Sequence, residues 1–167
     1  RFAMSSDQAA LDEVNVEFWE ELCGTRFARR LGIEDASPAN LAKFDRAYLD
    51  MYPYLERRYL PRTLNGERVL EIGLGFGTVG TQLIRRGADY RGVDLASGPV
   101  QMMRHRLRSE GADEDRATLA SALSLPFADS GFDRVVSIGC LHHTGDLERS
   151  VREVHRVLRP GGEALVM

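Results

Sequence analysis

Four closely spaced glycines between residues 73 and 80 constrain this chain more than any other feature of its sequence. Residues 69–72 before them form a short apolar run that contains one acid, Glu71, and helical spacing of apolar residues begins at Thr78. The pattern predicts a buried strand, a tight glycine turn and a helix. Glycine lets the backbone lie flat against a ligand and permits positive φ angles. Because the first N–H groups of the helix point at the turn, we expect a nucleotide-type cofactor there.

Two classes of cofactor compete for this turn. Gly75-x-Gly77-x-x-Gly80 fits the dinucleotide fingerprint, and Asp94 follows at about the expected distance. Glu71 instead favours a ligand with positive charge, since a carboxylate near the helix N-terminus is unfavourable for a pyrophosphate. A turn that only packs strand on helix is the third interpretation, and it is disfavoured because spaced glycines cost stability.

The bulk composition is that of a globular protein with one domain. The chain has 167 residues, of which 43% are hydrophobic and 28% charged, and this is enough for one real core. A formal net charge of −3 argues against a nucleic-acid partner, and residues 104–108 read as a solvated basic helix face. Two cysteines predict no disulfide framework and a cytoplasmic setting, and no apolar run is long enough for a membrane span.

The first 65 residues read as helices. Residues 5–31 carry apolar side chains at helical spacing, including Leu11 and Val14, and a second helix starts at Ser37-Pro38, where serine can cap and proline fits the first turn. The segment that follows is rich in tyrosine, with Tyr48, Tyr52, Tyr54 and Tyr59. A tyrosine face can attract a sulfonium by a cation–π interaction, although amphipathic packing explains each residue more simply.

Several segments beyond residue 65 together resemble one family. The run Glu71-x-Gly73-x-Gly75-x-Gly77 resembles motif I of class I S-adenosylmethionine-dependent methyltransferases. A strand ending in an acid at residue 94, a Leu-Pro-Phe segment at 125–127, a Leu-His-His run at 141–143 and a Leu-Arg-Pro-Gly-Gly turn at 158–162 follow in the family's order. The resemblance covers about residues 66–167, and it is closest to the small-molecule, type 11-like group.

The resemblance implies an α/β fold with a doubly wound, mainly parallel sheet in the order 3-2-1-4-5. Residues 66–167 would form a Rossmann-like cofactor-binding core and residues 1–65 a helical lid over it. Strands are expected at residues 69–72, 90–94, 117–120, 132–138 and 163–167. The chain ends within the last of these, so the family's usual final two strands are expected to be missing. The resulting open sheet edge predicts a homodimer or a partner that covers it.

Two further helices are expected in the core. Ser97 should cap one over residues 99–110, and Asp146 should cap another after the Leu-His-His run. Apolar residues at helical spacing predict the buried stripe of the second helix, namely Leu147, Val151, Val154 and Leu158.

The resemblance assigns S-adenosylmethionine as the cofactor, with S-adenosylhomocysteine as its product. Glu71 would lie near the cationic amino-acid end, and Asp94 would accept hydrogen bonds from the two ribose hydroxyls. Ser121 stands where the family often has an Asp at the adenine, so that contact lacks charge assistance, and a backbone N–H of residue 122 or 123 would remain. The predicted cofactor-binding set is Glu71, Gly73, Gly75, Gly77, Asp94, Leu95, Ser121, Ala122, Leu123 and Cys140.

His142 and His143 are the candidate general bases. Methyl transfer to a small-molecule acceptor needs a base only where the nucleophile carries a proton, and histidine titrates near neutral pH. His143 is preferred because the chain should turn outward into the cleft after it, while a histidine bonded to backbone is the structural alternative for each. No metal site is expected, since Cys140 and the two histidines are too close in sequence to form a tetrahedral set alone.

Two other functions stay open on the sequence. An NAD(P)- or FAD-dependent oxidoreductase would share the glycine turn and Asp94, but Glu71, the Leu-Pro-Phe segment and the lack of a Tyr-x-x-x-Lys pair argue against it. A non-catalytic, methyltransferase-like binding module is the other, and the early end of the chain gives it weight.

Overall fold

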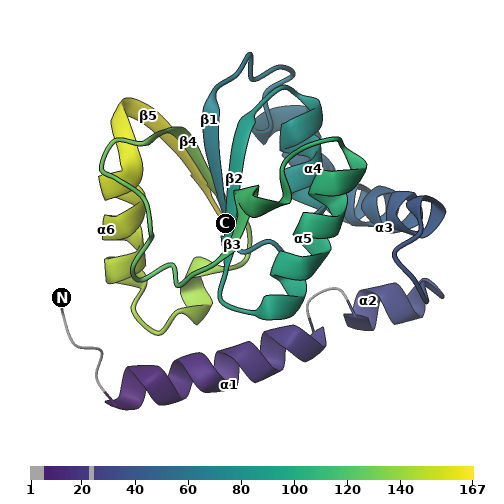
Figure 1. Ribbon diagram of the computed structural model, residues 1–167, viewed down its shortest axis with the longest axis horizontal. Helices are drawn as coiled ribbons and strands as arrows, with labels where there is room; N and C mark the ends of the chain where they lie inside the picture. The colour runs from purple at the N-terminus through teal and green to yellow at the C-terminus, as the bar shows by residue number, and fades with distance from the viewer. Residues whose placement is uncertain (1–5, 23–24) are drawn as a thin grey trace.

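The computed structural model describes the backbone of residues 6–22 and 25–167, and the side chains of residues 8–16 and 26–167. A parallel sheet of five strands in the order β3-β2-β1-β4-β5 forms the centre (Figure 1). The strands are β1 Arg68–Ile72, β2 Asp89–Asp94, β3 Ala117–Leu119, β4 Phe132–Ser137 and β5 Leu158–Val166. The predicted α/β fold class and strand order are confirmed.

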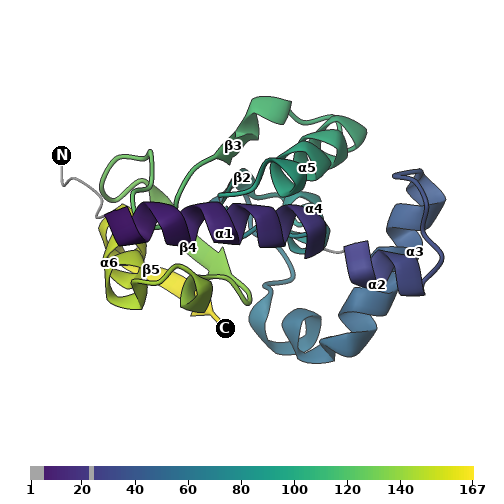
Figure 2. The ribbon, with the colours of Figure 1, turned by 90° about the horizontal axis from the view of Figure 1, so that it is seen from below.

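In the described part of the chain, six α-helices surround or precede the sheet. They are α1 Ser6–Leu22, α2 Thr25–Arg30, α3 Pro38–Met51, α4 Thr78–Arg85, α5 Ser97–Ser109 and α6 Leu147–Val157. A π-helical turn, η1 Leu55–Tyr59, and two 3₁₀ turns, η2 Glu114–Arg116 and η3 Leu141–His143, complete the pattern. Figures 1 and 2 show α1 running across the sheet at the end where the parallel strands finish.

The alternation of side chains along the strands builds a core on each face of the sheet. Val69 of β1 packs with Leu83 of α4 and Met103 of α5, whereas Leu70, the next residue, packs with Val154 of α6. All five of these side chains are buried. Successive strand side chains point to opposite faces, so a strand covered by helices on both sides is apolar at consecutive positions. This explains why β1 reads as one continuous apolar run around Glu71.

Local signals set several helix ends as predicted. Ser37 accepts a hydrogen bond from the Asn40 N–H and caps α3, with Pro38 as its first residue. Asp146 caps α6 by accepting from the Arg149 N–H at 3.0 Å. At α5, however, the N-cap position falls on Ala96 without a side-chain cap bond, so the predicted capping role of Ser97 is wrong.

Three other expectations need correction. Leu147 and Val151 of α6 are about half exposed, and the buried positions of this helix are Ser150, Val154 and Val157. The described part of residues 5–31 forms two helices, α1 and α2. The Pro-Gly-Gly segment lies inside β5, which begins at Leu158 and carries an irregularity opposite residues 132–134, because the chain there stays beside β4 while it turns.

Candidate functional site

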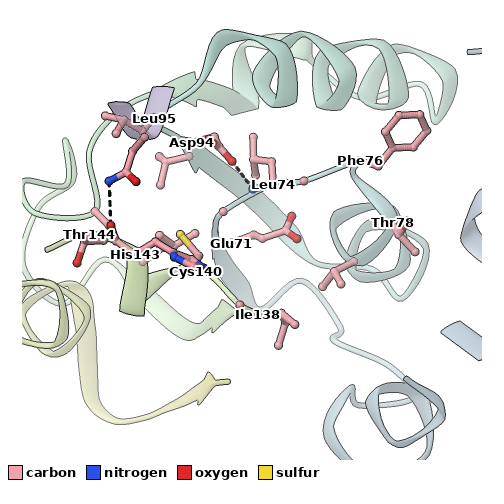
Figure 3. A pocket seen from close by; sticks show the side chains of 18 of the residues that line it. Glu71, Leu74, Phe76, Thr78, Asp94, Leu95, Ile138, Cys140, His143 and Thr144 are labelled. Carbon is pink, nitrogen blue, oxygen red and sulfur yellow. Dashed lines mark hydrogen bonds between the residues drawn. The ribbon is translucent and has the colours of Figure 1, made fainter. Parts of the chain in front are cut away.

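A cavity of about 360 Å³ lies at the carboxyl edge of the sheet, beneath the N-terminal helices (Figure 3). Its lining comes from the ends of β1, β2 and β4, from the glycine turn after β1, and from α1, α2 and α3. Open parallel sheets bind ligands at this edge, and the volume falls in the range of small-molecule sites.

Asp94 at the end of β2 fixes the shape of the glycine turn. Its Oδ2 accepts a hydrogen bond from the Leu74 N–H at 2.7 Å, drawn in Figure 3, and its Oδ1 accepts from the Ala96 N–H at 2.9 Å. Burial raises the pKa of this carboxyl, while the backbone N–H groups oppose the shift. Gly73 has φ +86°, and a Cβ there would lie 2.5 Å from the Cβ of Cys140, so only glycine fits.

Glu71 lies at the base of the turn and is almost completely buried. The Tyr90 hydroxyl donates a hydrogen bond to its Oε2 at 2.5 Å, and α4 passes so closely that a Cβ at Gly80 would lie 2.5 Å from the same oxygen. Burial raises the pKa of Glu71 to about 8, although the Tyr90 bond acts in the other direction. A cation that binds beside a buried, protonated carboxyl lowers its pKa and favours its ionised form.

A buried ion pair joins α3 to α5 beside the start of α4. Asp45 of α3 binds Arg106 of α5 through two hydrogen bonds of 2.8 and 2.9 Å, and it also accepts from the Thr78 hydroxyl at 2.7 Å. The rings of Phe44 and Phe76 stack beside it with centroids 4.2 Å apart. Arg106 is 3% exposed, so the interpretation of residues 104–108 as a solvated face is wrong at this position. The ion pair makes α3 part of the site.

The two histidines occupy the 3₁₀ turn η3, but they differ in their access to the cavity. His143 lines the cavity, whereas His142 does not, and their ring centroids are 3.9 Å apart. Partial burial and then the neighbouring His142 lower the pKa of His143, which favours its neutral form. Helix α1 crosses this turn: Asn15 donates to the His143 carbonyl at 2.8 Å, and Gln8 donates to the Thr144 carbonyl at 3.0 Å.

Most of the residues selected from the sequence come together here. Those that line the cavity are Glu71, Gly73, Gly75, Asp94, Leu95, Ser121, Ala122, Cys140 and His143. Gly77 is the N-cap residue of α4 and lies against Arg106 instead. The Leu123 N–H, considered for an adenine contact, donates to the Ser121 hydroxyl at 3.2 Å. Burial raises the pKa of the Cys140 thiol to about 12, which keeps it neutral.

Sequence reasoning did not assign the cavity wall formed by the N-terminal helices. Its members are Phe27, Phe44, Tyr48, Met51 and Tyr52. The tyrosine-rich composition of this segment was the one available signal. Within the described part of the chain, the side chains with a carboxyl group that line the cavity are Asp12, Glu71 and Asp94, and no lining residue is Arg or Lys. An acidic cavity built on a glycine turn suits a nucleotide that carries positive charge.

No group of three His, Cys, Asp or Glu side chains in the described part of the chain could hold a metal ion. Among its helices, none is both long and apolar enough to cross a membrane.

Comparisons with known proteins identify the family of the chain. Residues 70–166 match a family model described as a methyltransferase domain. Methyltransferase GfsG of Streptomyces halstedii is 40% identical over 104 residues, which are 60% of this chain and 37% of that protein. Phthiotriol/phenolphthiotriol dimycocerosates methyltransferase of Mycobacterium tuberculosis is 35% identical over 120 residues, 71% of this chain and 42% of that protein. The chain therefore spans less than half of the length of either relative.

Solved structures show the same fold. An S-adenosylmethionine-dependent methyltransferase from Mesorhizobium loti superimposes with a TM-score of 0.59 at 30% identity, covering 69% of this chain and 51% of that one. Geranyl diphosphate C-methyltransferase from Streptomyces coelicolor A3(2) reaches a TM-score of 0.68 over 93% of this chain and 63% of that one. At 20% identity, the second likeness concerns the fold alone.

Proposed function

The chain belongs to the class I S-adenosylmethionine-dependent methyltransferase family, and from this membership we propose that it transfers a methyl group from S-adenosylmethionine to a small-molecule acceptor. The N-terminal helices, residues 1–65, act as a lid over the cofactor-binding core in this proposal. Helices α1 and α3 support that role because residues of both line the cavity.

The acidic side chains of the cavity support S-adenosylmethionine as the cofactor. S-adenosylmethionine bears a sulfonium and an ammonium group, and the carboxyl groups near the ends of β1 and β2 are those of Glu71 and Asp94, of which Glu71 can ionise when a cation binds beside it. A dinucleotide would place a pyrophosphate beside the same turn, where burying its charge without a cation is costly. The residues present therefore fit S-adenosylmethionine better than NAD or FAD.

Each part of the cofactor has residues suited to hold it. Glu71 would pair with the ammonium of the amino-acid end. A carboxylate has about four acceptor positions, so Asp94 keeps capacity for the ribose hydroxyls while it binds two backbone N–H groups. Ser121 and Ala122 line the remaining side, where the adenine would lie.

His143 would serve as the general base. When bound, S-adenosylmethionine supplies a methyl group activated by its sulfonium. The cavity positions an acceptor for an in-line approach, and good orientation of two reactants contributes ~7–11 kcal/mol in favourable cases. Neutral His143 accepts the proton of an acceptor hydroxyl or amine, and its lowered pKa keeps that form populated near neutral pH.

Ligand-dependent thermal unfolding tests the cofactor assignment. S-adenosylhomocysteine at 100 times its Kd stabilises a protein that it binds only in the native state by ~2.7 kcal/mol, and we expect a corresponding rise in Tm. NAD and FAD at equal concentration should leave Tm unchanged. A rise with NAD and none with S-adenosylhomocysteine would refute the proposal. A rise with S-adenosylhomocysteine but no turnover of any acceptor would favour the non-catalytic binding module.

A further inference from the structure

Four aromatic side chains form a continuous wall on the part of the cavity lined by α2 and α3. This aromatic wall consists of Phe27 of α2, Phe44 and Tyr48 of α3, and Tyr52 just after α3. The Phe27 and Phe44 rings meet edge to face with centroids 5.2 Å apart, Phe44 and Tyr48 stack at 6.3 Å, and Tyr48 and Tyr52 lie 5.1 Å apart. Such contacts hold the rings in fixed orientations.

The aromatic wall is attached rigidly to the cofactor side of the cavity. Phe44 stacks on Phe76 of the glycine turn, and the neighbouring Asp45 forms the buried pair with Arg106. Because Phe44 is 3% exposed and locked between Phe27 and Phe76, the wall has little freedom to rearrange for a polar ligand.

No described residue that lines the cavity carries a positive charge, and the nearby Arg106, 5.8 Å from the Phe76 ring, is already paired with Asp45. The chain contains 22 Lys and Arg residues, yet none of them lines the cavity in the described part of the sequence. The basic residues of α3 are turned elsewhere: Lys43 donates to the Leu31 carbonyl at 2.6 Å, and Arg46 is exposed on another surface. A buried phosphate or carboxylate would find no counterion here, and Asp12 at the α1 side would repel it.

We propose that the acceptor is an uncharged, predominantly apolar molecule that packs on the aromatic wall and carries neither a phosphate nor a carboxylate group. The inference rests on the proposed function, since it assigns the part of the cavity left beside the cofactor. Burial of apolar surface supplies its affinity, at about 25 cal/mol per Å². The selectivity comes from the cost of burying an anion that no cation balances.

Two probes with the same ring system test the selectivity. Calorimetry would measure 2-naphthol and 2-naphthyl phosphate binding to the whole chain at neutral pH, with S-adenosylhomocysteine saturating so that only the acceptor side is open. We expect 2-naphthol to bind at least ~10-fold more tightly, a difference of ~1.4 kcal/mol. Equal or tighter binding of the phosphate, or no binding of 2-naphthol, would overturn the proposal.

A positive charge introduced at Met51 tests whether the preference for 2-naphthol arises in this cavity. Met51 ends α3, lines the cavity and is 51% exposed, so a polar substitution there does not disturb the core. Met51→Lys should reduce the preference for 2-naphthol at least ~3-fold, whereas the matched neutral variant Met51→Gln should keep it. Identical preferences in the two variants would contradict the assigned location.

The same experiments separate this inference from the proposed function. Binding of S-adenosylhomocysteine with a preference for the phosphate probe refutes the acceptor class and leaves the methyltransferase assignment standing. Failure of S-adenosylhomocysteine to bind, with 2-naphthol still preferred, refutes the methyltransferase assignment and keeps the selectivity of the cavity.

Discussion

The buried carboxyl of Glu71 should make this protein less stable as the pH rises through the neutral range. Burial raises its pKa to about 8 in the folded state, from an ordinary value of 4.5 in the unfolded chain. Between these two values the folded state keeps a proton that the unfolded chain has lost, so the free energy of unfolding falls with rising pH. The contribution is complete below pH ~4.5 and is lost as the pH rises through about 8.

The size of this effect follows from the pKa difference. One pKa unit corresponds to ~1.4 kcal/mol, so a shift of this size is worth on the order of 4 kcal/mol of stability between pH ~5 and ~9. Glu71→Gln removes the titration and keeps the shape of a protonated carboxyl beside Tyr90. The variant should therefore match the wild type near pH 5 and exceed it increasingly up to pH 9.

Urea unfolding of both proteins at several pH values measures the difference directly. Glu148→Gln is the matched control, because it removes one negative charge from the exposed face of α6. We expect the control to stay parallel to the wild type over this range. A difference between Glu71→Gln and wild type that stays constant within ~1 kcal/mol from pH 5 to 9 would refute the reasoning.

Three further predictions concern other residues of the site. Asp94→Asn removes one of the acceptor oxygens that serve the turn and the ribose, so calorimetry should show at least ~10-fold weaker S-adenosylhomocysteine binding with unchanged circular dichroism; unchanged affinity would make Asp94 purely structural. Asp45→Asn leaves the Arg106 charge buried without a counterion and should lower the free energy of unfolding by ~3–5 kcal/mol in urea, with partial recovery in the double variant with Arg106→Met; a loss below ~1 kcal/mol would contradict this. His143→Ala should lower kcat by ~10²–10⁴ with the cofactor Kd unchanged, whereas His142→Ala should stay within about threefold of wild type; equal losses would exclude the assigned base.

Local signals in the sequence were sufficient for the framework of the fold. The run of β1 with its glycine turn predicted strand, turn and helix, and Ser37-Pro38 marked the start of α3 correctly. Each signal acts within a few residues: a serine side chain caps its own helix, and a glycine relieves its own φ. The strand order follows from the family's topology, which is why it came out correctly without any contact being known.

The contacts that shape the site join distant segments, so local patterns did not predict them. Asp45 and Arg106 are 61 residues apart, and each reads in its own helix as an ordinary surface charge. Tyr90 appeared as one apolar residue of a strand, although its hydroxyl binds Glu71. The prediction that Leu147 is buried was wrong for the same reason. The helical period of α6 indicates which residues share a face, but it does not indicate which face packs against the sheet.

The described contacts that hold α1 are weaker than those that hold α3, and this difference indicates the side on which ligands enter and leave the cavity. Removing one partner of the buried pair that holds α3 costs ~3–5 kcal/mol, while the two described amide hydrogen bonds from Gln8 and Asn15 of α1 contribute about 2 kcal/mol together. Of the described apolar side chains of α1, Leu11 is 37% and Val14 is 62% exposed. Molecules that enter or leave should therefore pass beneath α1, across the loop of His143, while the aromatic side keeps its shape through each exchange.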